Sequence, residues 1–205
     1  MKKLFSAIRA NDIDTVRSII ENKPGLVNCV AKQPPKKDDG QSPLQVALKC
    51  GANEIAMYLL DMGADVNYME ADDCCNEWRM PVIQCAIQSA VMQTRWNTCD
   101  GIFGLKVFNT KDAADKSYAV LERILDMGAD INMTDSYGNT ALDRAILDAE
   151  QILPGINSDG TPGRERLLTK KLSKDISRIF ELLKKHGAAK TRFSPDGSSA
   201  VWKFM

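Results

Sequence analysis

Hydrophobic residues recur at helical spacing in three separate stretches of the chain. In each stretch, two or more hydrophobic residues lie four positions apart, and a further hydrophobic residue comes after them. The groups are Ile55, Leu59 and Leu60; Val120, Ile124 and Leu125; and a longer stripe of Leu167, Leu168, Leu172, Ile176, Ile179, Phe180 and Leu183. Positions four apart lie on one face of an α-helix, so each stretch predicts an amphipathic helix. We expect the third to begin at Thr161-Pro162, with Thr161 as its cap.

An eight-residue segment that follows the first helix returns after the second. Leu60–Asn67 reads LDMGADVN, and Leu125–Asn132 reads LDMGADIN. Weaker copies occupy Ile20–Asn28 and Leu183–Lys190. A glycine such as Gly63 lies where a left-handed helix C-cap is needed, and Gly128 and Gly187 hold the same position in their copies. The chain is therefore built from internal repeats.

A second motif precedes each repeated helix and turn. It reads SPLQVA at Ser42–Ala47, MPVIQC at Met80–Cys85 and TALDRA at Thr140–Ala145. A Ser or Thr caps a helix whose first turn tolerates proline, and a small residue five places later lets a neighbouring helix approach closely. Together, the two motifs resemble the ankyrin repeat, which begins Thr-Pro-Leu-His-x-Ala and turns at Gly-Ala-Asp-x-Asn.

The resemblance implies an all-α solenoid of about four helix-pair repeats with a stunted fifth. We take 1–205 as a single domain. The expected repeats are residues 2–28, 40–67, 78–132 and 138–190, followed by a capping stub at 191–205. Repeats 3 and 4 carry long insertions between their two helices, because their helical motifs are far apart. Trp202 and Phe204 in the stub are expected to cover the last helix pair.

Two departures from the ankyrin pattern bear on its structure. No repeat keeps the motif histidine: Phe5, Gln45, Ile83 and Asp143 stand in its place. We therefore expect a side-chain hydrogen bond between neighbouring repeats to be missing. Trp78 replaces the turn glycine of the third repeat, so the second hairpin tip is not expected to be standard.

The insertions combine helical extension with loops. Ile87, Val91 and Arg95 are expected to continue the inner helix of repeat 3, and residues 97–109 and 154–160 read as loops. The first loop is unusually apolar. It contains Ile102, Phe103, Leu105, Val107 and Phe108. Our expectation is that Ile102, Phe103, Leu105 and Phe108 fold onto the region of Ile152, Leu153 and Ile156 as a small separate core. The alternative is an exposed patch that binds a partner.

The inventory of reactive residues argues against an enzyme. His186 is the only histidine, so neither a Ser-His-Asp triad nor a histidine-based metal site can form. The chain has no Gly-x-x-x-x-Gly-Lys or Gly-x-Gly-x-x-Gly motif. Cys74 and Cys75 are the one candidate for a soft metal, but adjacent thiolates rarely both reach one tetrahedral ion. We expect no catalytic residue, no metal and no cofactor.

Composition places the chain among folded proteins. Of its residues, 44% are hydrophobic and 26% are charged. The 27 basic residues balance the 27 acidic ones, which argues against general nucleic-acid binding as its role. No apolar run is long enough for a membrane span or a secretory signal, and the six cysteines form no Cys-x-x-Cys pair. We expect a cytoplasmic monomer with free thiols, with export as an effector left open.

The ankyrin resemblance implies a non-catalytic module that binds another protein, as an inhibitor, adaptor, toxin-neutralising partner or effector. In the family, contacts come from hairpin tips and the exposed ends of inner helices. The corresponding residues are Asp38, Asp39, Gln41, Lys49, Asn76, Glu77, Trp78, Arg79, Ile87, Gln88, Ser136, Tyr137, Asn139, Leu147 and Asp148. Trp78, Arg79 and Tyr137 are expected to be the main anchors, since aromatic and arginine side chains dominate interface energetics.

A basic segment supports an alternative function. Between Arg164 and Arg192, ten basic residues stand against three acidic ones. Arg164, Lys171, Lys174, Arg178 and Lys185 avoid the apolar stripe and would form one basic face. Such a face could bind nucleic acid or acidic lipid.

Overall fold

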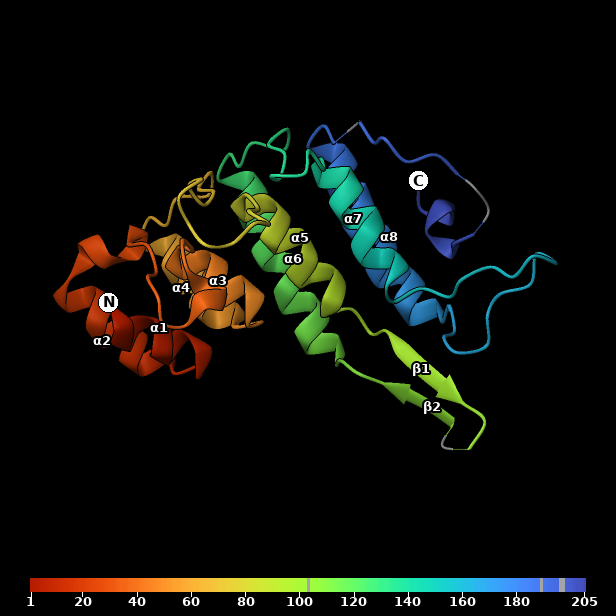
Figure 1. Cartoon of the computed structure of the whole chain (residues 1–205). Coiled ribbons are helices and arrows are strands. Elements are labelled where there is room, and N and C mark those ends of the chain that lie inside the picture. Colours follow the sequence, from red (N-terminus) through yellow and green to blue (C-terminus); the bar gives the residue numbers. More distant parts are fainter. Residues whose placement is uncertain (103, 189, 196–197) are drawn as a thin grey trace.

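The computed structural model is a row of paired helices, shown in Figure 1. It describes residues 1–102, 104–188, 190–195 and 198–205. The α-helices are α1 (Lys2–Arg9), α2 (Ile13–Asn22), α3 (Pro43–Lys49), α4 (Asn53–Asp61), α5 (Val82–Met92), α6 (Lys111–Asp126), α7 (Ala141–Glu150) and α8 (Lys170–Lys185). Short 3-10 helices are η1 (Pro24–Asn28), η2 (Lys36–Asp38) and η3 (Ala200–Lys203), and two strands are β1 (Asn97–Asp100) and β2 (Gly104–Val107).

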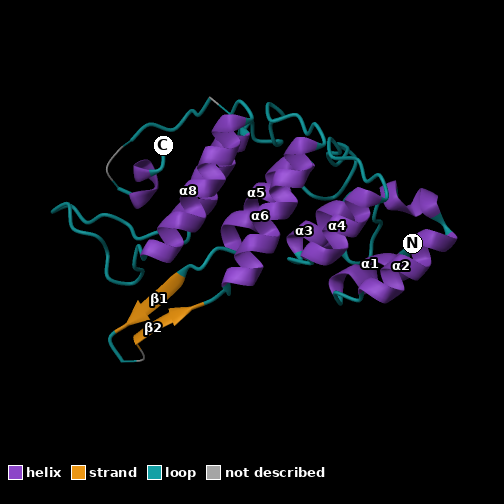
Figure 2. Ribbon diagram, turned by 180° about the vertical axis from the view of Figure 1, so that it is seen from behind, coloured by secondary structure: helices purple, strands orange, loops and turns teal. Residues whose placement is uncertain are grey.

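The helices stack as a solenoid. Each odd-numbered helix packs on the even-numbered helix that follows it. The odd-numbered helices α1, α3, α5 and α7 contact one another in chain order and form the inner row, while α2, α4, α6 and α8 form the outer row. Figure 2 shows these rows from behind. The predicted helical repeat fold is confirmed, with one small sheet in addition to the helices.

Local sequence signals set the starts of α3 and α7 as expected. The Ser42 hydroxyl accepts a hydrogen bond from the Gln45 backbone N–H at 3.2 Å, and the Gln45 side chain accepts one from the Ser42 N–H at 2.9 Å. Thr140 and Asp143 form the same capping box. Gly63 has a positive φ of 84°, which an L side chain rarely adopts, so glycine is required at this helix end.

Glutamine side chains link neighbouring repeats despite the absent motif histidine. The Gln45 amide donates to the Met80 carbonyl at 2.7 Å, across to the next repeat. In the next repeat, Gln84 donates to the Asn139 carbonyl at 2.7 Å. It holds the equivalent position in place of the predicted Ile83, because α5 begins one residue later than the motif predicted, with Pro81 as its N-cap. The expectation that hydrogen bonding between repeats would be lost is therefore wrong. The glutamine side chain is long enough for its amide to reach a backbone carbonyl in the turn of the next repeat.

The two insertions depart from the predicted helical extensions. Helix α5 ends at Met92, short of Arg95, because the Arg95 side chain and backbone N–H bind the buried Asp175 carboxylate on α8. Helix α8 begins only at Lys170, capped by Thr169, and not at Thr161-Pro162. The preceding segment is extended, since its backbone pairs in short bridges such as Ile156 with Pro162.

The predicted loop at residues 97–109 contains a β-hairpin, which corrects both the loop and the all-α description. Strand β1 pairs antiparallel with β2, and Asn97 lies opposite Val107. The expected separate core is not formed by the described apolar residues of this hairpin. Ile102 is 87% exposed, and Leu105, Val107 and Phe108 are exposed too. Phe103 lies outside the described residues.

The segment after α8 returns to the last helix pair. Val201 in η3 is fully buried, and Trp202 is partly buried against the same core. The ring of Phe204 stacks on the ring of Phe180 with centroids 6.3 Å apart. Residues of the predicted stub therefore cover part of α8.

Candidate functional site

A groove opens between the second hairpin tip, at residues 68–81, and the inner helices α3 and α5. It has a volume of about 280 Å³. Its lining residues are Lys37, Gln41, Lys49, Asn76, Glu77, Trp78, Met80, Cys85 and Gln88. Six of these nine belong to the contact surface predicted from the sequence. We call this cavity the tip groove.

Trp78 is the largest side chain of the tip groove. Trp78 is 40% exposed, yet contacts with two neighbouring side chains fix the position of its indole. Its Nε1 donates to the Asp135 carboxylate at 3.0 Å, and the Arg144 guanidinium lies 5.0 Å from the ring centroid. A residue that takes the place of the usual turn glycine therefore presents a fixed aromatic face.

Basic side chains flank the opposite wall of the tip groove. The Lys49 ammonium donates to the Lys37 carbonyl at 2.8 Å. Asp38 lies behind them and is buried, with a carboxylate oxygen 2.6 Å from the Arg9 guanidinium. Asp38 thus has a structural role, and Lys37 and Lys49 are exposed beside the tip groove, with the Lys49 ammonium also 3.9 Å from the Asp38 carboxylate.

Hydrogen bonds join the first and second hairpin tips. Asp39 accepts from the Cys75 N–H at 3.0 Å, and the Asn76 side chain donates to the Asp39 carbonyl at 2.6 Å. The Tyr68 hydroxyl donates to the Gly40 carbonyl at 2.6 Å. Burial, helped by nearby Glu70, raises the pKa of Tyr68 to about 12, so this donor keeps its proton at neutral pH. The tips form one connected wall.

Cys74 and Cys75 are part of this wall. The Cys75 thiol donates to the Lys36 carbonyl at 3.5 Å. Burial and the neighbouring Asp39 raise the pKa of the Cys75 thiol, which disfavours a reactive thiolate. Within the described ranges, no three His, Cys, Asp or Glu side chains are grouped to hold a metal ion.

Several predicted contact residues lie elsewhere than expected. Asp38, Ile87, Asn139 and Asp148 are buried, so their prediction as exposed contacts is wrong. The polar ones have partners inside the fold: Asp38 binds Arg9, the Asn139 side chain binds Asp135, and Asp148 binds Arg144. Gln41 is almost fully buried at the tip groove. The other predicted residues are at least partly accessible; they are Asp39, Lys49, Asn76, Glu77, Trp78, Arg79, Gln88, Ser136, Tyr137 and Leu147.

The tip groove also contains residues that the sequence argument missed. Lys37, Met80 and Cys85 line it. Met80 could have been found, because it directly precedes Pro81 at the start of an inner helix, where the tip meets the helix row. Cys85 was expected only in the core, and it is indeed buried.

Ser136 and Arg79 extend the surface toward the third tip. The Arg79 N–H donates to the Ser136 hydroxyl at 3.1 Å, and the Ser136 N–H donates to the Arg79 carbonyl at 3.0 Å. The Arg79 guanidinium also pairs with Asp72 at 2.7 Å. Tyr137 is 59% exposed beyond this link. The second and third tips therefore present Trp78, Arg79 and Tyr137 in sequence along one surface.

Asp135 organises the third tip and supports the Trp78 ring. It accepts hydrogen bonds from the Trp78 indole, the Asn139 side chain and the backbone N–H groups of Asn139 and Tyr137. Burial raises the pKa of Asp135, but these hydrogen bonds outweigh burial and leave the pKa below its ordinary value of 3.8. The ionised carboxylate is thus the form that the fold favours.

We expect Asp135→Asn to lower the melting temperature at pH 7, because an amide cannot accept all four donors. The lowered pKa makes the stabilising effect of Asp135 complete above the unfolded pKa of 3.8, and the effect is lost as the pH falls through the folded value. The difference in melting temperature between wild type and variant should therefore become smaller from pH 5 to pH 2. Thermal unfolding followed by circular dichroism measures this difference, and a difference that does not depend on pH would contradict this role of Asp135.

The predicted basic face is interrupted by internal contacts. The Arg178 guanidinium binds Asp115 at 2.6 Å and lies 4.6 Å from the centroid of the Tyr118 ring. The Lys184 ammonium donates to the Phe204 carbonyl at 3.1 Å. Arg192 lies 3.6 Å from the buried Asp143 carboxylate. Of the five residues expected to form the basic face, Arg178 is thus engaged within the fold, while Lys184 and Arg192 lie elsewhere in the basic segment. The alternative of a nucleic-acid or lipid surface gains no support.

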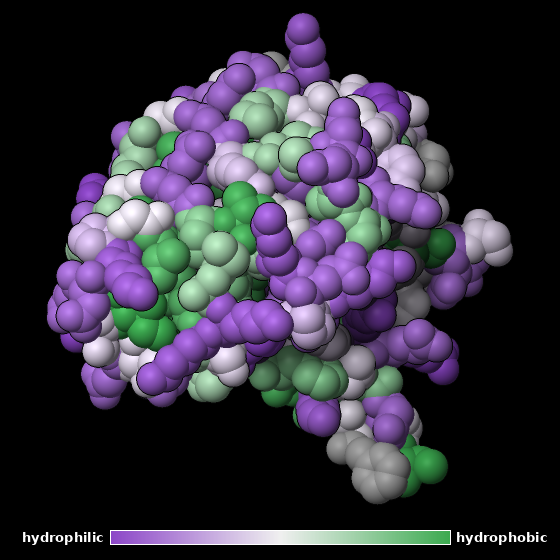
Figure 3. Space-filling model, turned by 60° about the vertical axis from the view of Figure 1, so that its left-hand side comes forward, coloured by the Kyte–Doolittle hydropathy of each residue, from purple (hydrophilic) through white to green (hydrophobic). Residues whose placement is uncertain are grey.

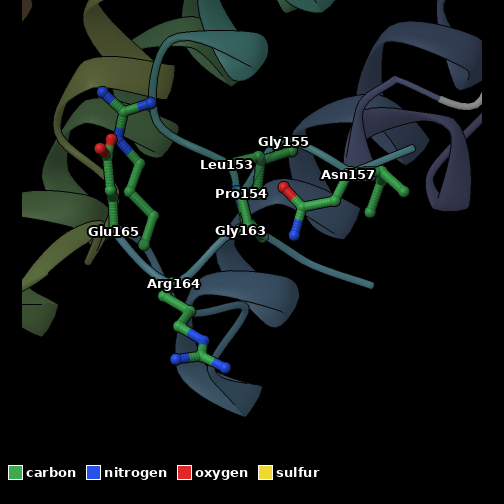
Figure 4. A pocket seen from close by; sticks show the side chains of 9 residues that line it. Leu153, Pro154, Gly155, Asn157, Gly163, Arg164 and Glu165 are labelled. Atoms are coloured by element: carbon green, nitrogen blue, oxygen red, sulfur yellow. The ribbon is translucent and has the colours of Figure 1, made fainter. Parts of the chain in front are cut away.

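A second cavity, of about 320 Å³, lies within the second insertion (Figure 4). Its lining includes Leu153, Asn157, Arg164 and Glu165, and none of the predicted contact residues. The backbone on its rim is tied together, with the Gly163 N–H donating to the Gly155 carbonyl at 2.8 Å. This cavity lies at the opposite end of the helices from the tip groove.

In the described part of the chain, no helix has the length and apolar character required to cross a membrane. Comparison with curated proteins found no match. Family descriptions match two segments that correspond to the repeated motifs: "Ankyrin repeat" matches residues 39–71, which contain α3 and α4, and "Ankyrin repeats (many copies)" matches residues 113–148, from within α6 into α7. The motifs, the stacked helix pairs and both matches agree, and the chain is an ankyrin-repeat protein.

Proposed function

We propose that this chain binds another protein through the tip groove and the adjoining surface of Arg79 and Tyr137, without catalysis. Ankyrin repeats generally mediate protein–protein interaction. The four described helix pairs and the segment after them would act as one binding domain. The observation that carries the proposal is Trp78, an aromatic side chain that remains accessible although two neighbours hold it in place.

The tip groove suits a protein ligand in shape and chemistry. Trp78 and Met80 supply apolar surface, Lys37 and Lys49 supply cations, and Gln88 supplies an amide. Interfaces of this kind combine an aromatic anchor with polar groups that fix orientation. The hydrogen bonds between tips reduce the conformational entropy lost on binding, because the wall is already ordered.

Site-directed photo-crosslinking tests the location of the contact. A photoreactive amino acid is placed at Lys49 or Glu77 beside the tip groove, and at the exposed Glu54 on the outer helix α4 as the matched control. In native lysate, the two groove positions should crosslink to the same protein, which mass spectrometry identifies. An excess of the protein without the photoreactive residue should suppress this crosslinking. Equal labelling from Glu54 would overturn the proposed surface.

The identified partner then allows a quantitative test. We expect Trp78→Ala to weaken its binding at least about tenfold, since truncating a central aromatic anchor commonly has such an effect. The comparison is Trp202→Ala, which removes a partly buried tryptophan after α8, away from the tips. Circular dichroism checks that both variants are folded. Unchanged affinity of folded Trp78→Ala would show that Trp78 is not an anchor.

A further inference from the structure

The β-hairpin projects from the solenoid at the end of the helices opposite the tip groove (Figures 1 and 2). Strand β1 is joined to the extended segment before α8. The Cys99 N–H donates to the Glu165 carbonyl at 2.7 Å. The Asn97 side chain donates to the Leu167 carbonyl at 2.9 Å and accepts from the Leu167 N–H at 2.9 Å. Contacts with a distant part of the chain therefore hold β1 in place.

The base of the hairpin is closed by aromatic stacking. The rings of Trp96 and Phe108 lie 4.0 Å apart between centroids, with 10° between their planes. The Phe108 N–H donates to the Trp96 carbonyl at 3.0 Å. Both strands thus leave the body at a defined distance and orientation, so β2 is presented as an ordered strand.

The outer edge of β2 has unused backbone hydrogen-bonding groups. Because Phe108 bonds to Trp96, the residue directly before β1, alternation turns the N–H and C=O groups of Lys106 toward β1 and those of Leu105 and Val107 outward. Within the described part of the chain, these outward groups have no hydrogen-bond partner. The side chains of Leu105 and Val107 are 48% and 49% exposed. An edge of this kind is a template for an added strand.

Charge disfavours one way in which a second copy could occupy this edge. A second copy of β2, paired antiparallel about a two-fold axis through Lys106, would place two lysines directly opposite each other. Two residues that lie opposite each other at this position exchange no backbone hydrogen bonds, and their side chains are closer together than at the hydrogen-bonded positions. Two like charges facing each other there destabilise the pairing. Lys106 lies over the Phe108 ring, 4.8 Å from its centroid, on the face away from Leu105 and Val107.

We propose that the outer edge of β2 binds an extended segment of another protein, in which an acidic residue lies between two β-branched apolar residues. The backbone of that segment would pair with Leu105 and Val107. Its acidic side chain would face Lys106, and its apolar side chains would share a face with those of Leu105 and Val107. This strand-docking edge is separate from the tip groove and does not depend on the proposed function of that groove. Figure 3 shows the projecting part with hydrophobic and hydrophilic surface side by side.

A synthetic peptide, acetyl-Ser-Thr-Val-Glu-Val-Thr-Ser-amide, tests the strand-docking edge on the full chain. Two-dimensional NMR of the amides should show shifts confined to β2 and its neighbours, with slower hydrogen exchange at Leu105 and Val107. The same peptide with Lys in place of Glu should bind about fivefold more weakly, because an attraction becomes a repulsion. Lys106→Glu should reverse that preference.

Backbone variants separate strand addition from a general apolar contact. Val107→Pro removes one outward N–H without removing a bond to β1, so it should abolish peptide binding. Val107→Thr keeps the N–H and the β-branched shape and should retain binding. The proposal is overturned if the peptide shifts no amide of β2, if Lys106→Glu leaves the peptide preference unchanged, or if sedimentation shows a dimer that Val107→Pro dissociates.

Discussion

Asp148→Ala should lower the free energy of unfolding by about 3–5 kcal/mol, because it leaves a buried arginine without its charge partner. Arg144 and Asp148 lie one turn apart on α7 and are both buried. The guanidinium Nε is 2.8 Å from one carboxylate oxygen, and the second guanidinium nitrogen is 2.5 Å from the other. Burial raises the pKa of Asp148, although Arg144 and a hydrogen bond from Gln88 act in the opposite direction.

A double variant provides the control for this prediction. Arg144→Met combined with Asp148→Leu removes both charges, so it should be close to the wild type in stability. Urea denaturation at pH 7, followed by circular dichroism, compares the three proteins. A loss below about 1 kcal/mol for Asp148→Ala alone would contradict the buried pair. Because Arg144 lies under the Trp78 ring, the single variant should also change the tryptophan fluorescence of the tip groove.

Phe180→Ala is the second substitution with a large expected effect. Phe180 is fully buried within α8, and its ring packs on Phe204. Removing a buried phenylalanine costs about 3–5 kcal/mol, through lost transfer energy and the cavity that remains. We expect the variant to unfold in a cooperative transition whose midpoint lies at a lower urea concentration than that of the wild type.

Two matched variants identify what Phe180 contacts. Phe180→Leu should cost much less than Phe180→Ala, since it retains most of the apolar volume. Phe204→Ala should also cost less, because Phe204 is only partly buried. If Phe204 covers α8 as the structure shows, the double variant Phe180→Ala/Phe204→Ala should lose less stability than the two single variants lose in total. Additive losses would mean that the two rings do not share an energetic contact.

The two proposed surfaces lie at opposite ends of the helices. The tip groove is formed by the turns between repeats, whereas the strand-docking edge comes from the insertion between α5 and α6. Figure 1 shows the hairpin on the side away from the turns. A partner seated at one surface would leave the other accessible, so this geometry allows two proteins to be bound at the same time.

Signals confined to a few consecutive residues were sufficient for the helices and their turns. Ser42 and Thr140 cap their helices through residues three positions away, and Gly63 occupies a backbone conformation that few other residues adopt. These interactions are local, so they can be recognised from spacing alone. The ankyrin resemblance, applied to the same repeats, named six of the nine residues that line the tip groove, including Lys49, Asn76 and Trp78, and their role in binding stays a prediction.

Long-range contacts explain the sequence predictions that were wrong. Asp148 is polar and was expected at the surface, but the fold buries it as the partner of Arg144. Asn97 begins a strand because its amide binds Leu167, 70 positions later in the chain. The same contact keeps Leu167 out of the helix that its apolar spacing predicted.

The repeat, the helix pairs and the single histidine can be recognised from residue identity and short spacing alone. The burial of particular polar residues, the strands within the insertions and the open backbone edge of β2 arise only when distant segments pack together. Those features depend on pairing between segments such as 97–100 and 165–167, whose free energy comes from contacts that spacing along the chain does not encode.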